Sequence, residues 1–522
     1  MFKEPLIKSD VHQSVYCDLI RGSLIHALMR AIACVIGSDA FYSAEKKLLK
    51  IIVKCRRMYY NDRKRKSMSF VFLGGYNMEY IEKETACGVI RGIEKENCLE
   101  FRSVRYARAG RYEYPTQEDK WQGVYDATYF KDCCYQHRAF EPDEKVNPFY
   151  YKEFRKGLSF TYSEDCFFLN ICTPKKAENC PVLIFIHGGS FTGGSTDEGY
   201  INGERFAEKG IITVAMNYRL GPYGFCAHPD LSDGDGVCGN YGLFDQTTAI
   251  QWVIDHIASF GGNPKKITLM GQSAGAMSVD IHMTNPLLKG KIAGAILLSG
   301  AGLQRCVLKP LTPEKAKPFW ETVMKNAGCG SMQELRTVDA KKLYYAWRDA
   351  CQQTKFSMPY TFPVYDGKIM TEDSFVLRNI ADVPYLLGST CTDMIPIALE
   401  GIMKKWAKHV EKHNVNPCYI YNFNRFLPGD DMGAWHSADL LYVFSSLDFN
   451  WRPFEDVDFK ISGQITDAVV AFVKHGNPNC HSVPEWRPGR KRPMSFCENT
   501  DCDRWHTKDN IKYTLNGKGK TI

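Results

Sequence analysis

Short apolar runs alternate with longer stretches of helical periodicity through most of the chain. Residues 245–260 place Ala249, Trp252, Val253 and Ile257 on one face of a helix. Strands that alternate with helices predict an α/β fold, with a mostly parallel central sheet and helices on both faces. The runs with the length and composition of buried strands are 181–186, 211–216, 266–270, 293–298 and 383–388.

The run at 266–270 leads into a G-x-S-x-G pentapeptide, Gly271 to Gly275, and then into a helix-like stretch. A serine at such a strand-to-helix turn adopts a strained conformation that exposes its hydroxyl and directs the next backbone N–H toward a developing oxyanion. The pattern therefore predicts Ser273 as a nucleophile. Glycine and serine are common, so the same five residues also fit an ordinary turn, and the assignment depends on what accompanies the serine.

A glycine turn upstream supplies candidate donors for the oxyanion. The strand-like residues 181–186 run into His187-Gly-Gly-Ser-Phe, a turn of the kind that exposes backbone N–H groups. Together with the residue after the serine, this turn gives Gly188, Gly189 and Ala274 as the expected oxyanion hole.

A serine hydroxyl also needs a base, and His436 is the candidate with the most suitable context. It lies in Gly-Ala-Trp-His-Ser-Ala-Asp, after the strand-like residues 419–424 and a Pro-Gly-Asp-Asp turn, where a loop can carry it to the edge of the sheet. His187 is the rival base. Its place inside the glycine turn favours a role as a structural anchor of that turn.

Asp393 is the candidate that orients the base. It follows the apolar run at 383–388 by a few residues, so we expect it just past the carboxyl end of a strand, where open α/β sheets place their ligands. It also falls between the serine and the histidine in the chain, the order Ser, acid, His that this kind of fold uses. The alternative is an aspartate that caps a turn or a helix.

With these candidate residues and several further motifs, the sequence resembles the type-B carboxylesterases, the cholinesterase-like branch of the α/β-hydrolases. The resemblance covers roughly four-fifths of the chain. It implies an α/β-hydrolase fold with helical cap-like insertions, of which the helix-like segment 312–380 is expected to roof the active site. The motifs that carry it begin near Thr85 and include Trp121-Gln-Gly-Val-Tyr-Asp, Ser163-Glu-Asp-Cys, the His187 turn, Asn217-Tyr-Arg-Leu-Gly, Asn240-Tyr-Gly-Leu-Phe-Asp-Gln, Phe260-Gly-Gly-Asn-Pro, the serine turn and Phe472-Val-Lys-His-Gly-Asn-Pro.

The resemblance implies a serine carboxylic ester hydrolase that acts on small carboxylic esters through an acyl-enzyme, with Ser273, Asp393 and His436 as the catalytic triad and no cofactor. A catalytically inactive binding protein on the same scaffold is the alternative. Two residues depart from the family pattern: Asp393-Met394 replaces the usual glutamate and glycine, and Gln272 replaces a glutamate before the nucleophile. Because Gln272 is neutral, a choline ester is a less expected substrate.

The first eighty residues differ from the rest of the chain. They hold 14 Lys/Arg and 7 Asp/Glu, so the whole formal net charge of +7 lies there. We therefore expect residues 1–80 to be a basic N-terminal extension of unknown role before an esterase domain at 81–522. The basic cluster within residues 54–66 could contact an anionic surface weakly, but no nucleic-acid-binding motif accompanies it and no nucleic acid is expected. Residues 24–37 are apolar but too short to span a bilayer.

Twenty cysteines without a recognisable signal peptide predict a reducing, cytoplasmic location. Cys134 and Cys166 resemble the pair that forms a disulfide in secreted relatives, with Cys133 as a competitor, and in the cytoplasm we expect thiols. Cys497, Cys502 and His506 superficially suggest zinc, but three ligands at this spacing are not typical of a structural site, and no metal is expected.

Overall fold

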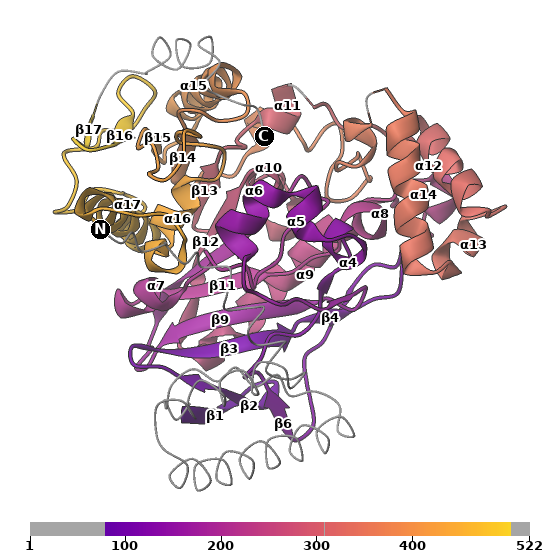
Figure 1. Cartoon of the computed structure of the whole chain (residues 1–522), viewed down its shortest axis with the longest axis horizontal. Coiled ribbons are helices and arrows are strands. Elements are labelled where there is room, and N and C mark those ends of the chain that lie inside the picture. The colour runs from indigo at the N-terminus through magenta and orange to yellow at the C-terminus, as the bar shows by residue number, and fades with distance from the viewer. Residues whose placement is uncertain (1–78, 307, 356, 503–522) are drawn as a thin grey trace, which may run out of the picture. The chain divides into compact units, whose positions relative to one another are not determined.

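The computed structural model describes residues 79–306, 308–355 and 357–502 (Figure 1). By its contacts the chain divides after Asn77 into two units, and the described residues belong to the second, which begins at Met78. The expectations for residues 1–78, including the basic cluster at 54–66, lie outside the described residues. So does His506.

A large mixed sheet forms the centre of this unit. In spatial order its strands are β1 (Glu79–Thr85), β2 (Gly88–Glu94), β3 (Cys98–Arg105), β9 (Phe168–Pro174), β11 (Ile212–Met216), β10 (Cys180–Ile186), β12 (Gly262–Gln272), β13 (Gly294–Leu298), β14 (Tyr385–Thr390), β15 (Cys418–Phe423), β16 (Met494–Phe496) and β17 (Asp501–Cys502). A short strand, β6 (Val124–Asp126), adds to it beside β2. The middle of the sheet, from β11 to β16, is entirely parallel, whereas the neighbours from β1 to β11 and the pair β16–β17 are antiparallel.

The central strands are buried on both faces, which explains their continuous apolar sequence. Along β10, Val182, Ile184 and Ile186 enter one hydrophobic core, whereas Leu183 and Phe185 enter a second core on the opposite face. Successive side chains of a strand point to opposite faces, so a strand covered on both sides needs an apolar residue at every position. The predicted α/β fold with a mostly parallel sheet is confirmed.

Helices from distant parts of the chain cover the two faces. On one face α9 (Tyr241–His256), α10 (Ala274–His282) and α15 (Pro396–His413) contribute to the first core. On the other face α7 (Glu204–Glu208), α16 (Asp439–Val443) and α17 (Asp456–His475) contribute to the second core. The remaining helices are α4 (His137–Phe140), α5 (Asp143–Val146), α6 (Pro148–Tyr150), α8 (Gly221–Gly224), α11 (Leu303–Cys306), α12 (Pro313–Ala327), α13 (Met332–Thr337) and α14 (Ala340–Gln353), with a π-helical turn at Tyr151–Arg155.

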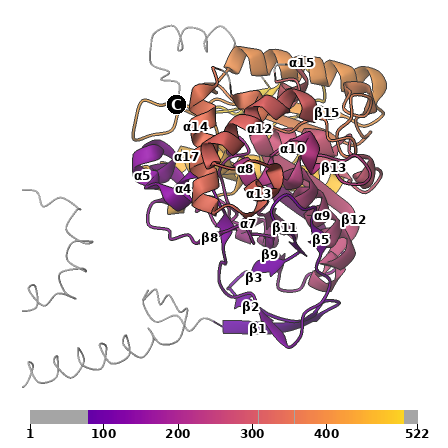
Figure 2. The same ribbon diagram turned by 90° about the vertical axis from the view of Figure 1, so that its right-hand side faces the viewer.

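The expected helical segment 312–380 is only partly helical. Its helices α12, α13 and α14 lie together as one group in Figures 1 and 2. Trp320 and Leu343, from α12 and α14, are buried in a third core that these helices share with Tyr223 of α8. Residues 354–380 are largely irregular. The amphipathic faces of these helices thus pack mainly on one another.

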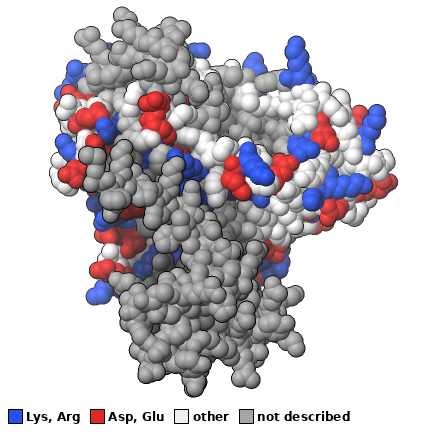
Figure 3. Space-filling view, viewed as in Figure 1, with Lys and Arg blue, Asp and Glu red and all other residues white. Residues whose placement is uncertain are grey.

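The described surface mixes charges of both signs. In Figure 3 acidic and basic side chains lie beside one another rather than in a patch of one sign. Residues 81–522 carry equal numbers of Lys/Arg and Asp/Glu, 52 of each. Among the described helices, none has the length and apolarity needed to cross a membrane.

Candidate active site

Ser273 occupies the sharp turn between β12 and α10. Its backbone angles, φ 55° and ψ −122°, belong to a region that non-glycine residues rarely adopt. The turn is crowded: a Cβ on Gly271 would lie 2.2 Å from the Gly275 carbonyl oxygen, and one on Gly275 would lie 2.0 Å from the Ile186 oxygen. Both glycines are therefore required where strand, turn and helix pack this closely. The surrounding sheet maintains this strained conformation, which places the serine at the carboxyl end of β12.

Asp393 and His436 meet at the carboxyl ends of two neighbouring strands of the sheet. Asp393 follows β14 and His436 follows β15, and a backbone bridge between Thr392 and Trp435 holds their two loops side by side. His436 Nδ1 lies 2.6 Å from Asp393 Oδ1. The carboxylate also accepts hydrogen bonds from the Thr390 hydroxyl, at 3.0 Å, and from the Met394 backbone N–H, at 2.8 Å. These bonds fix the acid, and the acid fixes the imidazole tautomer with hydrogen on Nδ1.

The electrostatics of this pair favour a charged carboxylate and a basic imidazole. Burial acts to raise the pKa of Asp393, but the charge and hydrogen bond of His436 outweigh it and the pKa is lowered. Burial acts to lower the pKa of His436, but the Asp393 carboxylate outweighs it, with help from Asp439, and the pKa is raised.

Asp439 is a second buried carboxylate near this pair, and the sequence analysis did not identify it. It opens α16 and accepts a hydrogen bond of 2.8 Å from the Tyr421 hydroxyl. Burial and the charge of Asp393 raise the pKa of Asp439 to about 6. Its position three residues after His436 was visible in the sequence, but its burial behind the histidine depends on how α16 packs.

Ser273 and His436 line one cavity of about 260 Å³. Within the described residues the Ser273 hydroxyl makes no hydrogen bond, and the side-chain amide nitrogen of Gln272 lies 3.3 Å from His436 Nε2. Catalytic hydrogen bonds are often long or misaligned before a substrate binds. With hydrogen on Nδ1, His436 Nε2 accepts from the Gln272 amide in this structure, and both residues line the cavity together with Ser273.

The glycine turn lies against the same cavity. Gly188 and Gly189 line it, and Gly189 adopts φ 103°, which a residue with a Cβ rarely does. Ala274 is not among the lining residues, but it begins α10, and N–H groups in the first turn of a helix lack intrahelical partners. His187 is buried and stacks on Tyr218, with ring centroids 4.5 Å apart. Burial lowers its pKa to about 4, so it is neutral and suited to anchoring the turn.

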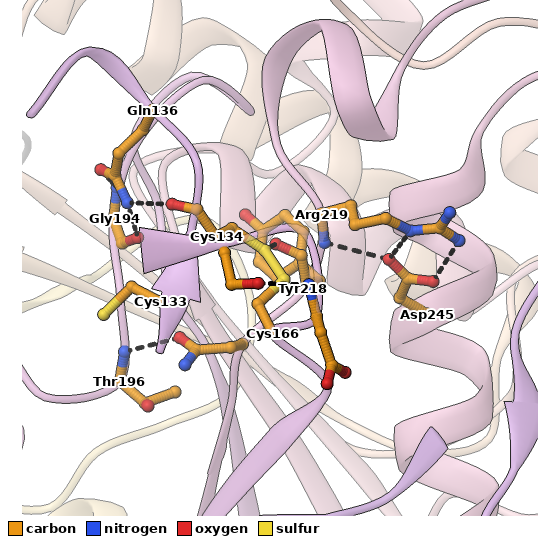
Figure 4. Close-up of a disulfide and its surroundings, with 12 residues drawn as sticks. Cys133, Cys134, Gln136, Cys166, Gly194, Thr196, Tyr218, Arg219 and Asp245 are labelled. Atoms are coloured by element: carbon orange, nitrogen blue, oxygen red, sulfur yellow. Dashed lines mark hydrogen bonds and ion pairs between the residues drawn. A yellow bond between two sulfur atoms is a disulfide. The ribbon is translucent and has the colours of Figure 1, made fainter. Parts of the chain in front are cut away.

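Gln136 holds Gly194, a few residues after this turn (Figure 4). Its side-chain oxygen accepts from the Gly194 N–H at 3.0 Å, and its amide nitrogen donates to the Gly194 carbonyl at 3.0 Å. The same nitrogen donates to the Cys134 carbonyl at 3.1 Å, which ties Gly194 to the loop that contains Cys134. A buried amide that satisfies both backbone groups of one residue fixes that residue's position. The sequence analysis did not identify Gln136. The one feature that could have drawn attention to it is its place two residues after Cys134.

Cys134 and Cys166 form a disulfide in this structure, in place of the thiols expected for a cytoplasmic location. Their Cα atoms are 5.1 Å apart, within the range that a disulfide can bridge. Cys133, the expected competitor, is a free thiol whose sulfur lies 3.2 Å from Asp197 Oδ1. Strand pairing of residues 133–134 with 162–163 sets which cysteine faces Cys166, and this register is not readable from spacing alone.

The loop closed by this disulfide, residues 134–166, forms much of the cavity wall. It contributes residues of α4, α6 and the π-helical turn, whereas no described residue of 312–380 lines the cavity. The helical insertion buries its apolar faces in its own core and touches the glycine turn through Phe362, which packs on Phe191, while the disulfide loop supplies the wall beside the serine. The lining residues from this loop are Gln136, His137, Arg138, Asn147, Tyr150, Phe154 and Arg155.

Within residues 79–306, 308–355 and 357–502, no group of three or more His, Cys, Asp or Glu is arranged to hold a metal ion. The chemistry available at the cavity is that of a serine hydroxyl, a carboxylate-oriented imidazole and backbone N–H groups.

Comparison with known proteins finds relatives over most of the chain. The model of the carboxylesterase family matches residues 81–413 and 401–512. Bile salt-activated lipase of Mus musculus is 34% identical over 335 residues, which is 58% of this chain and 51% of that protein. Para-nitrobenzyl esterase of Bacillus subtilis is 27% identical over 465 residues, covering 76% of this chain and 91% of that protein. The chain thus spans about half the length of the first of these relatives and most of the second.

Solved structures show the same fold. A PNB esterase superposes with a TM-score of 0.70 at 23% identity, covering 83% of this chain and 98% of the other. An esterase from Clostridium hathewayi superposes with a TM-score of 0.68 at 23% identity, covering 85% and 100%. At these identities the structural match establishes the α/β-hydrolase fold, while the sequence match to the family model covers most of the chain. The chain belongs to the carboxylesterase family.

Proposed function

We propose that this chain is a serine carboxylic ester hydrolase that cleaves small carboxylic esters through an acyl-enzyme on Ser273. The observation that carries the proposal is the convergence of four separate chain segments: the strained serine, His436 and the glycine turn line one cavity, and Asp393 holds His436 at 2.6 Å. A binding protein has no need of a strained serine beside a buried, oriented imidazole. The inactive alternative is accordingly disfavoured.

The reaction follows from the roles of these groups. His436 Nε2 takes the proton of the Ser273 hydroxyl as its oxygen attacks the ester carbonyl, and Gly188, Gly189 and Ala274 donate N–H groups to the oxyanion. The imidazolium then protonates the leaving alcohol. Water, activated by the same histidine, hydrolyses the acyl-enzyme and releases the acid. Asp393 stays ionised throughout and stabilises the imidazolium, and no cofactor takes part.

The preferred ester is expected to be uncharged. Gln272 brings an amide rather than a carboxylate to the cavity, so the residue before the nucleophile offers a substrate cation no charge. Hydrolysis of p-nitrophenyl esters from acetate to laurate, compared with a choline ester, tests this proposal. Turnover of the neutral esters with little turnover of the choline ester supports it, and the absence of turnover on every ester refutes it.

The pH dependence of kcat/KM should report the raised pKa of His436. Only the neutral imidazole can accept the serine proton, and a raised pKa keeps the protonated form to higher pH. Activity should therefore be lost as the pH falls through a midpoint above the ordinary histidine value of 6.5. The variant Asp439→Asn removes a charge that raises this pKa, so the midpoint should move to lower pH. Asp448→Asn, an exposed aspartate, is the control. A midpoint at or below 6.5 in the unaltered protein would contradict this reading of the pair.

Removing the hydrogen bonds from the Gln136 side chain to Gly194 should lower kcat more than it raises KM. In Gln136→Met the Gly194 backbone loses both of its bonds to this side chain. Loss of a whole oxyanion donor costs about 10²- to 10³-fold in kcat, so a displaced turn is expected to cost about 10- to 100-fold. Steady-state kinetics checks this, with Gln352→Met, at an exposed position, as the control. Unchanged kcat in a folded Gln136→Met protein would show that these hydrogen bonds are not needed.

The cytoplasmic location remains a prediction. An intact Cys134–Cys166 disulfide in protein taken from cells would count against it, because cytoplasmic thiols are kept reduced. Counting free thiols in freshly purified, alkylated protein distinguishes the two cases.

A further inference from the structure

A second cavity, of about 410 Å³, lies apart from the cavity at Ser273 and shares no lining residue with it. Cavities of this size hold small organic molecules. Its walls come from α11 and the residues after it, from an irregular segment at 375–377 and from α15, all on the face of the sheet that α10 covers. The lining residues are Gly302, Gln304, Arg305, Cys306, Lys309, Pro310, Tyr365, Phe375, Val376, Leu377, Ile402, Lys405 and Trp406.

The charged residues of this cavity are all cationic. Arg305, Lys309 and Lys405 line it, and no aspartate or glutamate of the described residues does. Among the described residues, neither Lys309 nor Lys405 makes an ion pair. Both lysines are exposed, and an anionic occupant would give each of them a counter-ion, whereas Arg305 is already paired with Asp280.

Arg305 is built into the wall rather than exposed. Its side chain is only 8% exposed and is held through Nε and Nη2 by Asp280, whereas Nη1 is buried and has no hydrogen-bond partner within the described residues. The guanidinium stacks over the Phe375 ring, 3.8 Å from its centroid. The two N–H groups on Nη1 are thus unused, which is an unusual cost to the fold unless an acceptor can reach them.

Two further lining residues carry unpartnered polar atoms. The Trp406 indole N–H and the Gln304 side-chain oxygen are both buried without a partner within the described residues, while the Gln304 amide nitrogen donates to the Pro363 carbonyl. The rest of the wall is apolar or aromatic, with Phe375, Leu377 and Ile402 among its members. The cavity thus combines a cationic, hydrogen-bonding part with a hydrocarbon-binding part.

We propose that this cavity binds a monocarboxylate with a hydrocarbon chain. The carboxylate would lie among Arg305, Lys309 and Lys405, and the chain would lie on the apolar residues of the wall. This site is separate from the proposed chemistry at Ser273 and does not require it.

Titration calorimetry with decanoate, below its micellar concentration, tests the site. The matched variants are Lys309→Gln/Lys405→Gln, which neutralises two lining cations, and Lys408→Gln/Lys412→Gln, which neutralises two lysines of α15 that do not line the cavity. We expect saturable binding to the unaltered protein, at least about tenfold weaker binding to the first variant and unchanged binding to the second. Equal loss in both variants, or no saturable binding to the unaltered protein, would overturn the proposal.

A second pair of variants examines the apolar wall. Leu377→Glu places a negative charge in the cavity, and Leu287→Glu places one at an exposed leucine elsewhere. Decanoate affinity should fall only in Leu377→Glu, and butyrate and 1-decanol should each bind the unaltered protein more weakly than decanoate. If 1-decanol bound as tightly as decanoate, the cationic part of the site would be refuted. Hydrolysis of p-nitrophenyl acetate, measured in parallel, should not change in any of these variants, so failure of this site is distinguishable from failure of the esterase proposal.

Discussion

Replacing Ser273 with alanine is expected to lower kcat for p-nitrophenyl acetate by about 10⁵- to 10⁶-fold, to the level that the remaining groups support. The reason is that the reaction passes through a covalent acyl-serine on Ser273. Among the described serines that line the cavity with a positive φ, which are Ser190, Ser273 and Ser437, only Ser273 lies at the turn between β12 and α10. Substrate binding should survive, because the cavity wall is unchanged. Steady-state and single-turnover kinetics on the purified variant give both quantities.

The control for this substitution is Ser278→Ala, which removes another hydroxyl of α10. The Ser278 hydroxyl is buried, donates to the Ala274 carbonyl and accepts from the Gln246 amide, so its loss perturbs the helix while Ser273, His436 and the Ala274 N–H all remain. It should keep kcat within a few-fold of the unaltered protein. Residual activity of Ser273→Ala above about one-hundredth of the unaltered value would mean that another group is the nucleophile.

Replacing Asp393 with asparagine is the second large effect, with an expected fall in kcat of about 10⁴-fold. An asparagine can donate its amide hydrogen to His436 Nδ1, which moves the imidazole hydrogen to Nε2 and leaves no lone pair facing Ser273. The 2.6 Å contact between Asp393 and His436 makes this exchange of donor and acceptor direct. The pH profile of the residual activity, with its thermal melting curve, separates a wrong tautomer from a misfolded protein.

Asp439→Asn provides the comparison for that result. Both aspartates are buried near His436, but only Asp393 bonds to the imidazole. The Asp439 variant should therefore shift the pH profile while keeping most of the activity at its optimum. If Asp393→Asn retained activity within tenfold of the unaltered protein, a different carboxylate would orient the histidine.

Much of the central sheet could be predicted from the sequence, because a strand covered on both faces must be apolar at every position. The runs at 181–186 and 293–298 correspond to β10 and β13 within one residue at each end. β12 begins at Gly262, four residues before the predicted run. Its first residues are polar, and they belong to the strand because Gly262 pairs with Cys180 of β10, not because they are buried. A pairing between segments that far apart leaves no periodic signal in the chain.

The candidate residues were predictable for a related reason. Ser273, Asp393 and His436 each follow a recognisable strand, and the carboxyl ends of parallel strands meet at one edge of the sheet. Their surroundings were not predictable. Gln136 reaches the glycine turn because a disulfide and a short strand pair position its loop, and Asp439 lies behind the histidine because α16 packs there.

The packing of the helical insertion was also only partly predictable from the sequence. The pattern of α12 and α14 indicated that each helix buries one face, but not what covers it. In the fold the two helices cover each other's apolar faces and those of α8, so the cavity wall is formed by the disulfide loop. Amphipathic periodicity indicates that one face of a helix is buried. Which element covers that face depends on how the whole chain folds.

Covalent labelling tests most directly whether Ser273 is an activated nucleophile. The unaltered protein is treated with a fluorophosphonate probe and the modified peptide is identified by mass spectrometry. We predict one label per chain, on Ser273, formed far more slowly in His436→Ala and absent in Ser273→Ala. A folded protein that takes no label, or takes it on a residue other than Ser273, would contradict the proposed chemistry.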